Sequence, residues 1–443
     1  MGPVSTMLGY KKITTRKAGL WERRDLLRRV SEVLEFSEQV VHSVVHDEWP
    51  ETTDVQSTGL AGAFQEKVIA ETAMLLFCVA SVPDVERALR GRIQNITTLL
   101  TPLARSERIL AELCAHPEQA SDIAVAHAIV SRLGCPNTHV DALLRECVAL
   151  HRDFGPERLP LCRLSKEWLA RVWGSSTATH PEPGLLVRSI LGRPLDLLGA
   201  TRFDVYSFTH AIIYATDFGG RRPRFPRSKS AIAVDADAAL GLSLDIDDLD
   251  VTSELLMTWP MLALAWSPTA TFAFSIVSAA YDQFGFLPGP TFESTGYEVS
   301  TLEARVPYVF ATSYHTTYVM GMLCAAALRE GSCPPMDIVC STSTGSSGTL
   351  LSLYKESAVR PRWRSALDKL TPSQQDAVAP LILTILLRQA KDRADFCELR
   401  AILEVAVAYG LVEGPAVRQA TALLKRSALF SRIIASQECA PLS

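Results

Sequence analysis

The chain has 443 residues, of which 48% are hydrophobic and 21% are charged, and its formal net charge is −4. This balance is typical of a globular protein and excludes an intrinsically disordered chain. The small negative charge provides no basic surface, so we expect no nucleic acid as a partner. A chain of this length exceeds the size at which one core stops growing, so we expect two regions, 1–175 and 185–443.

The N-terminal segment and the longest uncharged stretch bear on localisation. Residues 1–30 are basic, but no apolar segment with a small-residue cleavage site follows them, so we expect a soluble, cytoplasmic protein. The uncharged stretch from Leu255 to Tyr281 is long enough to span a bilayer. It contains a Ser267-Pro268 junction, which normally separates two helices. We therefore expect two buried core helices there and no membrane as a partner.

Helical periodicity runs along the chain from its first apolar segment. Apolar residues recur at helical spacing from Leu26 to Val41, and the pattern continues in segments near 62–80, 85–114, 119–133 and 138–151. Loop-like intervals follow at 174–184, 219–227 and 286–301, and helical patterns return near 373–390, 395–409 and 415–434. No Asn-Gly or Asp-Gly dipeptide indicates a hairpin. The pattern predicts an all-α fold, as a multi-helix bundle or an α/α toroid-like assembly.

The segment 209–219 places polar side chains in an otherwise apolar helix. His210, Tyr214 and Asp217 stand at i, i+4 and i+7, so we expect them on one helix face, with the helix ending at the glycines that follow. Burying such groups is costly. We therefore interpret His210, the expected proton carrier, and Asp217 as catalytic, and Tyr214 as substrate-binding. The alternative is a core histidine satisfied by Asp217 or by a carbonyl group.

Carboxylates gather in the segment 244–256. On a helix, Asp247, Asp250 and Glu254 lie along one face, where they could raise one another's pKa, supply a proton or bind a divalent cation. We favour Asp250 and Glu254 as catalytic residues over Asp247, because the apolar helix starts beside them and carries them inward. The alternative is that these acids complement the helix dipole, with Asp248 or Asp250 as the N-cap.

A third polar segment opens an apolar helix that we expect to run from Tyr314 to about Leu328. His315 is the second candidate catalytic imidazole, and Tyr314 and Tyr318 are candidate substrate-binding residues. The alternative is a structural histidine at a helix start. Gly321 inside a helix costs roughly 1 kcal/mol relative to Ala, so we expect another helix or a ligand to approach closely there.

Motifs for common cofactors do not occur in the chain. The basic loop at 219–227 carries Arg221 and Arg222, which could clamp an anionic group of a substrate, although a solvated loop explains them equally well. There is no glycine-rich nucleotide-binding motif and no His-Glu-x-x-His, so we expect no nucleotide cofactor. The ten cysteines form no Cys-x-x-Cys pair, so we expect free thiols and no structural zinc, and we assign no metal ligand.

Two resemblances can be stated on these motifs. Asp245-Ile246-Asp247-Asp248 resembles the Asp-x-Asp-Asp motif of class II terpene cyclases, helical-toroid enzymes whose central aspartate protonates an alkene or epoxide. This resemblance implies that Asp247 is the acid, but Leu249 replaces the usual Thr and the Gln-Trp-type repeats are missing. The Thr-His…Thr-Asp-Phe-Gly, Asp-x-Asp…Glu-Leu-Leu and Tyr-His-Thr segments, over about 185–330, also resemble an uncharacterised family of helical actinobacterial proteins, which implies no known activity.

The sequence as a whole predicts an enzyme of specialised metabolism. It would act by acid/base chemistry on a small, largely apolar substrate in a helical cavity lined by His210, Asp217 and His315. We expect this substrate as the partner and no cofactor, and leave a homodimer open. The competing hypotheses are a non-catalytic helical scaffold that binds a protein, and a terpene-cyclase-like, protonation-initiated cyclase. Convergence of the polar segments on one buried pocket favours an enzyme, whereas segments far apart beside an exposed apolar groove favour a scaffold.

Overall fold

The computed structural model describes residues 22–45, 61–150, 159–176, 180–340, 345–354 and 361–438. Most of the basic N-terminal segment, residues 1–21, lies outside them. The first half of the chain forms α1 (Arg23–Val45), α2 (Ala61–Ala80), α3 (Pro83–Leu103), α4 (Glu107–Ala115), η3 (Pro117–Gln119), α5 (Ala120–Ile123), α6 (Val125–Arg132), α7 (Thr138–Leu150), α8 (Pro160–Trp173), α9 (Pro183–Arg188), η4 (Ile190–Gly192) and α10 (Arg202–Thr216).

The second half is also helical. It forms α11 (Lys229–Asp245), α12 (Leu249–Leu256), α13 (Thr258–Leu262), α14 (Pro268–Phe284), α15 (Ser294–Val299), α16 (Leu302–Ala327), α17 (Ser346–Leu353), α18 (Arg362–Leu367), α19 (Pro372–Ala377), α20 (Ala379–Asp392), α21 (Phe396–Ala408) and α22 (Pro415–Glu438). No strand occurs among the described residues, so the predicted all-α fold is confirmed.

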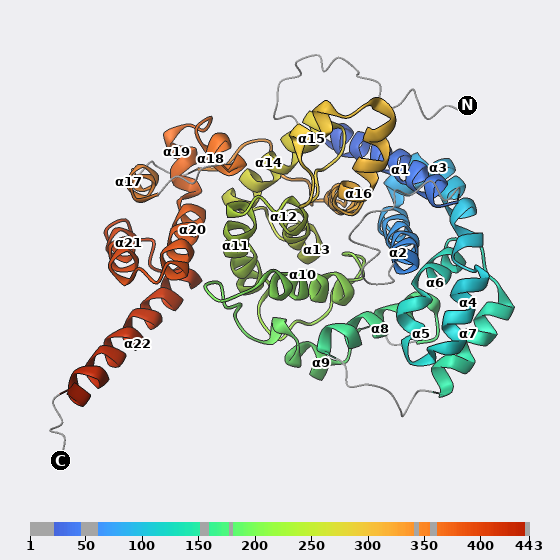
Figure 1. The fold of residues 1–443 in the computed structure, drawn as a ribbon, viewed down its shortest axis with the longest axis horizontal. Helices are drawn as coiled ribbons and strands as arrows, with labels where there is room; N and C mark the ends of the chain where they lie inside the picture. The colour runs from blue at the N-terminus through green and yellow to red at the C-terminus, as the bar shows by residue number, and fades with distance from the viewer. Residues whose placement is uncertain are drawn as a thin grey trace.

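The helices from α1 to α16 are arranged around a common centre (Figure 1). In this ring, α16 packs on α2, α2 on α6, α6 on α8, α8 on α10, α10 on α12, and α12 back on α16. The long helix α16 also lies along α1, so the beginning and the end of this segment of chain are side by side. Through these contacts, α16 joins the two regions expected on either side of residues 175–185.

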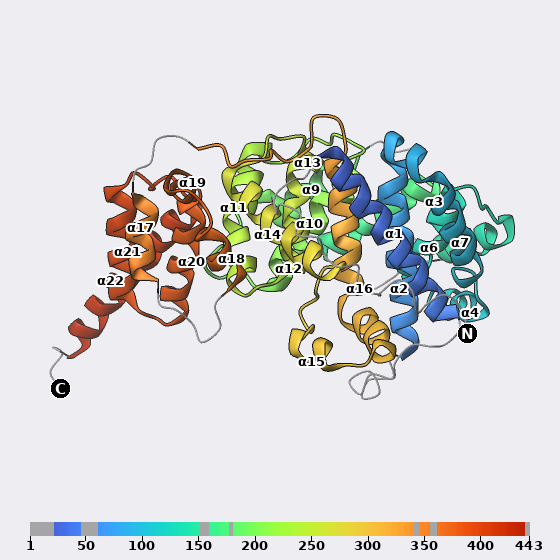
Figure 2. The same cartoon turned by 90° about the horizontal axis from the view of Figure 1, so that it is seen from above.

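The C-terminal helices form a second group beside the ring. Helices α17 to α22 lie together at the left of Figures 1 and 2, and α20 packs against α11 of the ring. Figure 2 shows that α22 extends away from the other helices. The helical patterns near 373–390, 395–409 and 415–434 correspond to α19–α20, α21 and α22.

The predicted break in the long uncharged stretch is confirmed. Helix α13 ends at Leu262, and α14 begins at Pro268, with the Ser267 hydroxyl accepting a hydrogen bond from the Ala270 amide. A serine N-cap followed by proline is a strong helix-start signal, because the hydroxyl satisfies a free amide and proline lacks one. None of the described helices is long and apolar enough to cross a membrane.

The helix boundaries expected in the segments of α3 and α16 were wrong. The segment 85–114 forms two helices, because the Ser106 side chain caps a new helix by accepting from the Ile109 amide. The helix expected to open at Tyr314 begins at Leu302, so His315 lies in its interior. Pro307 in this segment argues against a helix interior in a sequence, but α16 accommodates it near its N-terminal end.

Gly321 lies where α16 packs against two other helices. A Cβ atom at this position would lie 2.6 Å from Val33 Cγ1 on α1 and 3.1 Å from Leu75 Cδ1 on α2. These distances are shorter than normal carbon–carbon contacts, and the branched Val33 side chain has little rotamer freedom in a helix. The predicted close helix approach at Gly321 is therefore confirmed, and it allows α16 to seat against α1 and α2.

Replacing Gly321 by Ala is expected to lower the free energy of unfolding by up to about 2 kcal/mol. Overpacking costs about 1–3 kcal/mol, which exceeds the gain of at most about 1 kcal/mol in helix propensity. The matched control is Gly91→Ala in α3, where a Cβ atom meets nothing within 4 Å, so only the propensity gain remains. Urea unfolding should give changes of opposite sign, and equal stabilisation by both substitutions would contradict the close contact.

Asp237 connects α11 to the start of α14 within the ring. It accepts a hydrogen bond from the Ser267 hydroxyl, and burial raises the pKa of Asp237 to about 7 in spite of that bond. The folded state therefore binds a proton that the unfolded chain releases at the normal carboxyl pKa near 4. A group with a raised carboxyl pKa favours folding at low pH, and this contribution is lost as the pH rises from about 4 to 7.

Replacing Asp237 by Asn is expected to remove this pH dependence, because the amide keeps an oxygen acceptor for Ser267 and has no charge to bury. Urea midpoints of the two proteins should be similar at pH 4.5, and Asp237→Asn should be the more stable protein at pH 8. A difference between the two proteins that does not change from pH 4.5 to 8 would show that Asp237 does not titrate in this range.

Candidate functional site

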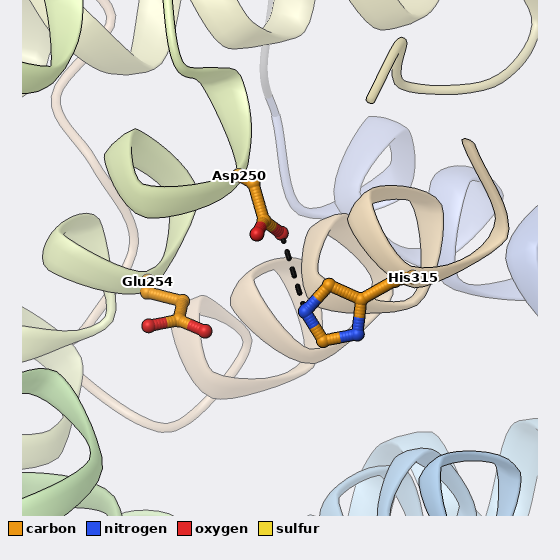
Figure 3. A group of neighbouring side chains, drawn as sticks. All are labelled: Asp250, Glu254 and His315. Carbon is orange, nitrogen blue, oxygen red and sulfur yellow. Dashed lines mark ion pairs between the residues drawn. The ribbon is translucent and has the colours of Figure 1, made fainter. Parts of the chain in front are cut away.

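The candidate site lies where α2, α10, α12 and α16 meet. Three acidic side chains and two imidazoles from these four helices contact one another there: Glu71 from α2, His210 from α10, Asp250 and Glu254 from α12, and His315 from α16. Figure 3 shows Asp250 and Glu254 pointing from α12 toward the imidazole of His315. Polar residues from the segments 244–256 and 314–328 therefore meet His210 from the segment 209–219.

Helix α12 carries two buried carboxylates one turn apart. Its start is set by Asp248, the N-cap, whose side chain accepts a hydrogen bond from the Val251 amide. Asp250 and Glu254 then follow at i and i+4 on one face, and they are only 5% and 3% exposed. Their predicted inward placement is confirmed, and Asp248 rather than Asp250 is the cap. Arg202 at the start of α10 bonds Asp248 at 2.7 Å and Asp250 at 2.8 Å.

His315 bridges acidic groups from two other helices. Its Nδ1 lies 2.9 Å from Glu71 Oε2 on α2, and its Nε2 lies 3.4 Å from Asp250 Oδ1 on α12. The imidazole is 30% exposed, whereas the Glu71 and Asp250 side chains are 17% and 7% exposed. Each ring nitrogen thus faces a different carboxylate, and the ring itself keeps an accessible surface.

His210 lies on the other side of Glu254. Its Nδ1 is 3.1 Å from the Tyr206 carbonyl oxygen and 3.5 Å from Glu254 Oε2. The Thr209 hydroxyl donates to the same Glu254 oxygen at 2.6 Å. The Tyr206 ring stacks on the imidazole, with ring centroids 3.7 Å apart. These contacts of Nδ1 fix the orientation of the His210 ring.

Burial and mutual charge shift the pKa values of four groups in this cluster. Burial alone would lower the pKa of His315, but the Glu71 and Asp250 carboxylates raise it to about 10. Burial works in the opposite sense on Glu71, yet the His315 charge holds the pKa of Glu71 below its usual value. Burial raises the pKa of Asp250, partly against His315, and the pKa of Glu254 is lowered by His210 although burial opposes this. The environment thus shifts the pKa values of Asp250 and Glu254, which lie one helical turn apart, in opposite directions.

Part of the cluster has the composition of a metal site. Ligand atoms from Asp250, Glu254 and His315 all lie within 4.8 Å of one another. Two carboxylates and one imidazole are ligands that divalent cations use in proteins. The same three side chains could instead act directly on a substrate as proton donors and acceptors.

Aromatic side chains surround the polar groups. Tyr214 packs its ring against His210, with centroids 5.8 Å apart, and against Trp168. Tyr314 lies next to His315, and its ring contacts Tyr318. The Tyr318 hydroxyl lies 3.0 Å from the Thr72 hydroxyl. Of the three tyrosines expected to bind a substrate, Tyr214 and Tyr314 therefore border the imidazoles, and Tyr318 lies one helical turn further along α16.

Asp217 is not brought to this cluster. The helix was expected to continue through it, but α10 ends at Thr216 and Asp217 has left-handed backbone angles, with φ of 54°. Its carboxylate accepts from Trp168 Nε1 at 2.8 Å and pairs with Arg221 at 3.3 Å. The expectation that His210 and Asp217 share a helix face was therefore wrong.

The remaining candidates from the sequence also lie elsewhere. Arg222 donates to the backbone carbonyl groups of Gly219 and Met261, so it ties the loop to α13. Asp247 precedes α12, has a φ of 58° and pairs with Arg362, the first residue of α18. It therefore does not share the face of Asp250, because the helix starts after it.

Sequence reasoning missed Glu71, Arg202 and the role of Thr209. Glu71 is the residue for which a signal existed, because it is the sole charged residue in the apolar run from Val68 to Ala80. Such a charge in a core helix is rarely buried without a partner. Arg202 and Thr209 carried no comparable signal, since a helix-start arginine and a helical threonine are common on any surface.

Replacing Thr209 by Val tests how firmly Glu254 is held. The isosteric change leaves a buried carboxylate without its short hydroxyl donor, so we expect a loss of about 1.5–3 kcal/mol in the free energy of unfolding. The control is Thr97→Val in α3, where the buried hydroxyl donates only to the Ile93 carbonyl group of its own helix. That control should cost less than about 1 kcal/mol in the same assay. Equal losses would mean that Thr209 does not stabilise a charged group.

Of the comparisons with known proteins, one gives a match, and it covers most of the ring. No curated protein and no solved structure matches the chain. A family model does match, over residues 34–325, which contain Glu71, His210, the acidic helix α12 and His315 and end within α16. The matched segment covers more than half of the chain and stops before the C-terminal helices. The chain belongs to the family described as a domain of unknown function, DUF6895.

Proposed function

We propose that this protein is an enzyme that transfers protons to or from a small, largely apolar substrate at the cluster of Glu71, His210, Asp250, Glu254 and His315. The observation that carries the proposal is the meeting of these five side chains from four helices. They are drawn from segments as far apart as α2 and α16, in a ring whose other contacts are mainly apolar.

The convergence favours an enzyme over a scaffold. A scaffold needs an exposed apolar surface and has no use for a buried group of mutually interacting acids and bases, which are costly to desolvate. Here His315 contacts two carboxylates, and Glu254 lies beside both His210 and Thr209. We therefore favour a catalytic role over a binding scaffold.

The roles follow from position. His210 is the proton carrier, because its Nδ1 is held by the Tyr206 carbonyl group and Glu254 while Nε2 is left for a substrate. Arg202 and Thr209 hold the acidic side chains in place from outside. The rings of Tyr206 and Tyr214 provide apolar contact surface for the substrate next to His210.

Solvent deuterium exchange tests this function without knowledge of the substrate. The purified protein is incubated in D₂O with a small-molecule extract of the organism that produces it, and mass spectrometry detects compounds that gain deuterium at carbon. His210→Asn and Asp250→Asn should each lower the exchange rate by about 10²- to 10⁴-fold, because an amide cannot carry the proton. Thermal unfolding of both variants should change little by comparison.

Two variants serve as controls. His139→Asn replaces an exposed imidazole on α7 and should leave exchange unchanged. Asp247→Asn replaces an acid outside the cluster and should also leave it unchanged. If Asp247→Asn alone abolished exchange, the terpene-cyclase-like alternative would replace our proposal. If no compound exchanged above the rate without protein, the scaffold alternative would be favoured.

A further inference from the structure

We propose that Asp250, Glu254 and the Nε2 atom of His315 bind a divalent transition-metal cation. The inference rests on the proposed function only in that both use the same site. The binding of the ion is measured separately from the transfer of protons. The ligand atoms of the three residues lie within 4.8 Å of one another (Figure 3). Three atoms bound at about 2.1 Å to one ion lie roughly 3–4 Å apart, so small side-chain rotations close the set.

Glu71 holds His315 in the orientation that a metal ligand requires. Histidine ligands commonly donate one ring N–H to a carboxylate, which fixes the tautomer and leaves the other nitrogen for the metal. His315 has this arrangement, with Nδ1 2.9 Å from Glu71 Oε2 and Nε2 directed toward α12. Among the three ligand residues, Glu71 of α2 has its hydrogen bond with His315. Its role is therefore to orient the His315 ring.

The two acidic side chains keep an oxygen free for the ion. In Asp250, Arg202 binds Oδ2, whereas Oδ1 is buried, accepts no hydrogen bond and faces His315 Nε2. A buried carboxylate oxygen without a donor is costly, and a cation would offset this cost. In Glu254, Thr209 binds Oε2, which leaves the other oxygen for a ligand. In each acid, one carboxylate oxygen thus accepts a hydrogen bond from a protein donor and the other oxygen is left for the ion.

Charge and ligand type indicate the class of ion. The site gathers the carboxylates of Glu71, Asp250 and Glu254 around His315, and Arg202 reaches only Asp250 and Asp248. A doubly charged ion balances part of this negative charge. Carboxylates suit Mn²⁺ and Mg²⁺ and an imidazole suits Zn²⁺ and Fe²⁺, so the mixed set favours a first-row transition ion such as Mn²⁺ or Zn²⁺ over Ca²⁺. Three protein ligands leave positions for water or substrate.

Direct titration tests the inference on the intact protein. After EDTA treatment and desalting, MnCl₂ is added and binding is followed by calorimetry and by the loss of the free Mn²⁺ EPR signal. We expect one Mn²⁺ per chain, a rise in melting temperature, and competition by Zn²⁺. Asp250→Asn should abolish this binding, and Glu71→Gln should weaken it by about 10- to 100-fold, as expected for a residue that orients a ligand.

The matched control is Asp247→Asn, which removes an acidic group three residues before Asp250 but outside the ligand set and should bind Mn²⁺ like the wild type. If Asp250→Asn fails to fold by circular dichroism, His315→Gln takes its place with the same expectation. The inference is overturned if the wild-type protein takes up neither Mn²⁺ nor Zn²⁺, or if binding is equal in the wild type and the ligand variant. Deuterium exchange without metal uptake would overturn only the metal site, and metal uptake without exchange only the proposed function.

Discussion

The close packing of α16 against α1 and α2 is the contact on which the rest of the ring depends. Gly321 makes it possible, because any larger residue would meet Val33 and Leu75. With α16 seated there, the circuit of helix contacts that runs through α6, α8, α10 and α12 closes on itself. His315 lies less than two turns before Gly321 on the same helix, so the contact that closes the ring also positions this imidazole next to Glu71.

The buried polar cluster is stabilised differently from this apolar packing, because its members need partners of opposite charge or hydrogen-bonding groups. Desolvating three carboxylates and two imidazoles is costly, and the cost is met only because each group has a partner on another helix. Arg202 and Thr209 supply donors to the acids, and Glu71 and Tyr206 fix the two imidazoles. Truncating one member to an apolar side chain would leave the others buried without a partner and would lower the stability of the fold.

Much of the site was readable from local pattern. Asp250 and Glu254 follow an N-cap at helical spacing in an apolar segment, and this spacing alone places them inward on one face. His210 and His315 stand out as imidazoles in apolar helices. Asp217 and Asp247 were misplaced for a common reason, which is that a helix was assumed to continue through a residue that instead adopts left-handed backbone angles. Helix ends depend on one or two residues, and periodicity does not locate them.

The sequence by itself determined the helical character of the chain, the break at Ser267-Pro268 and the close approach at Gly321, because propensity, capping and side-chain size act over a few residues. Only the tertiary structure decided which polar residues meet. The contact between Glu71 and His315 joins residues 244 positions apart, and no local rule relates them. The packing of whole helices decides which residues meet across the ring, so the candidate site exists only because α16 lies against α2 and α12.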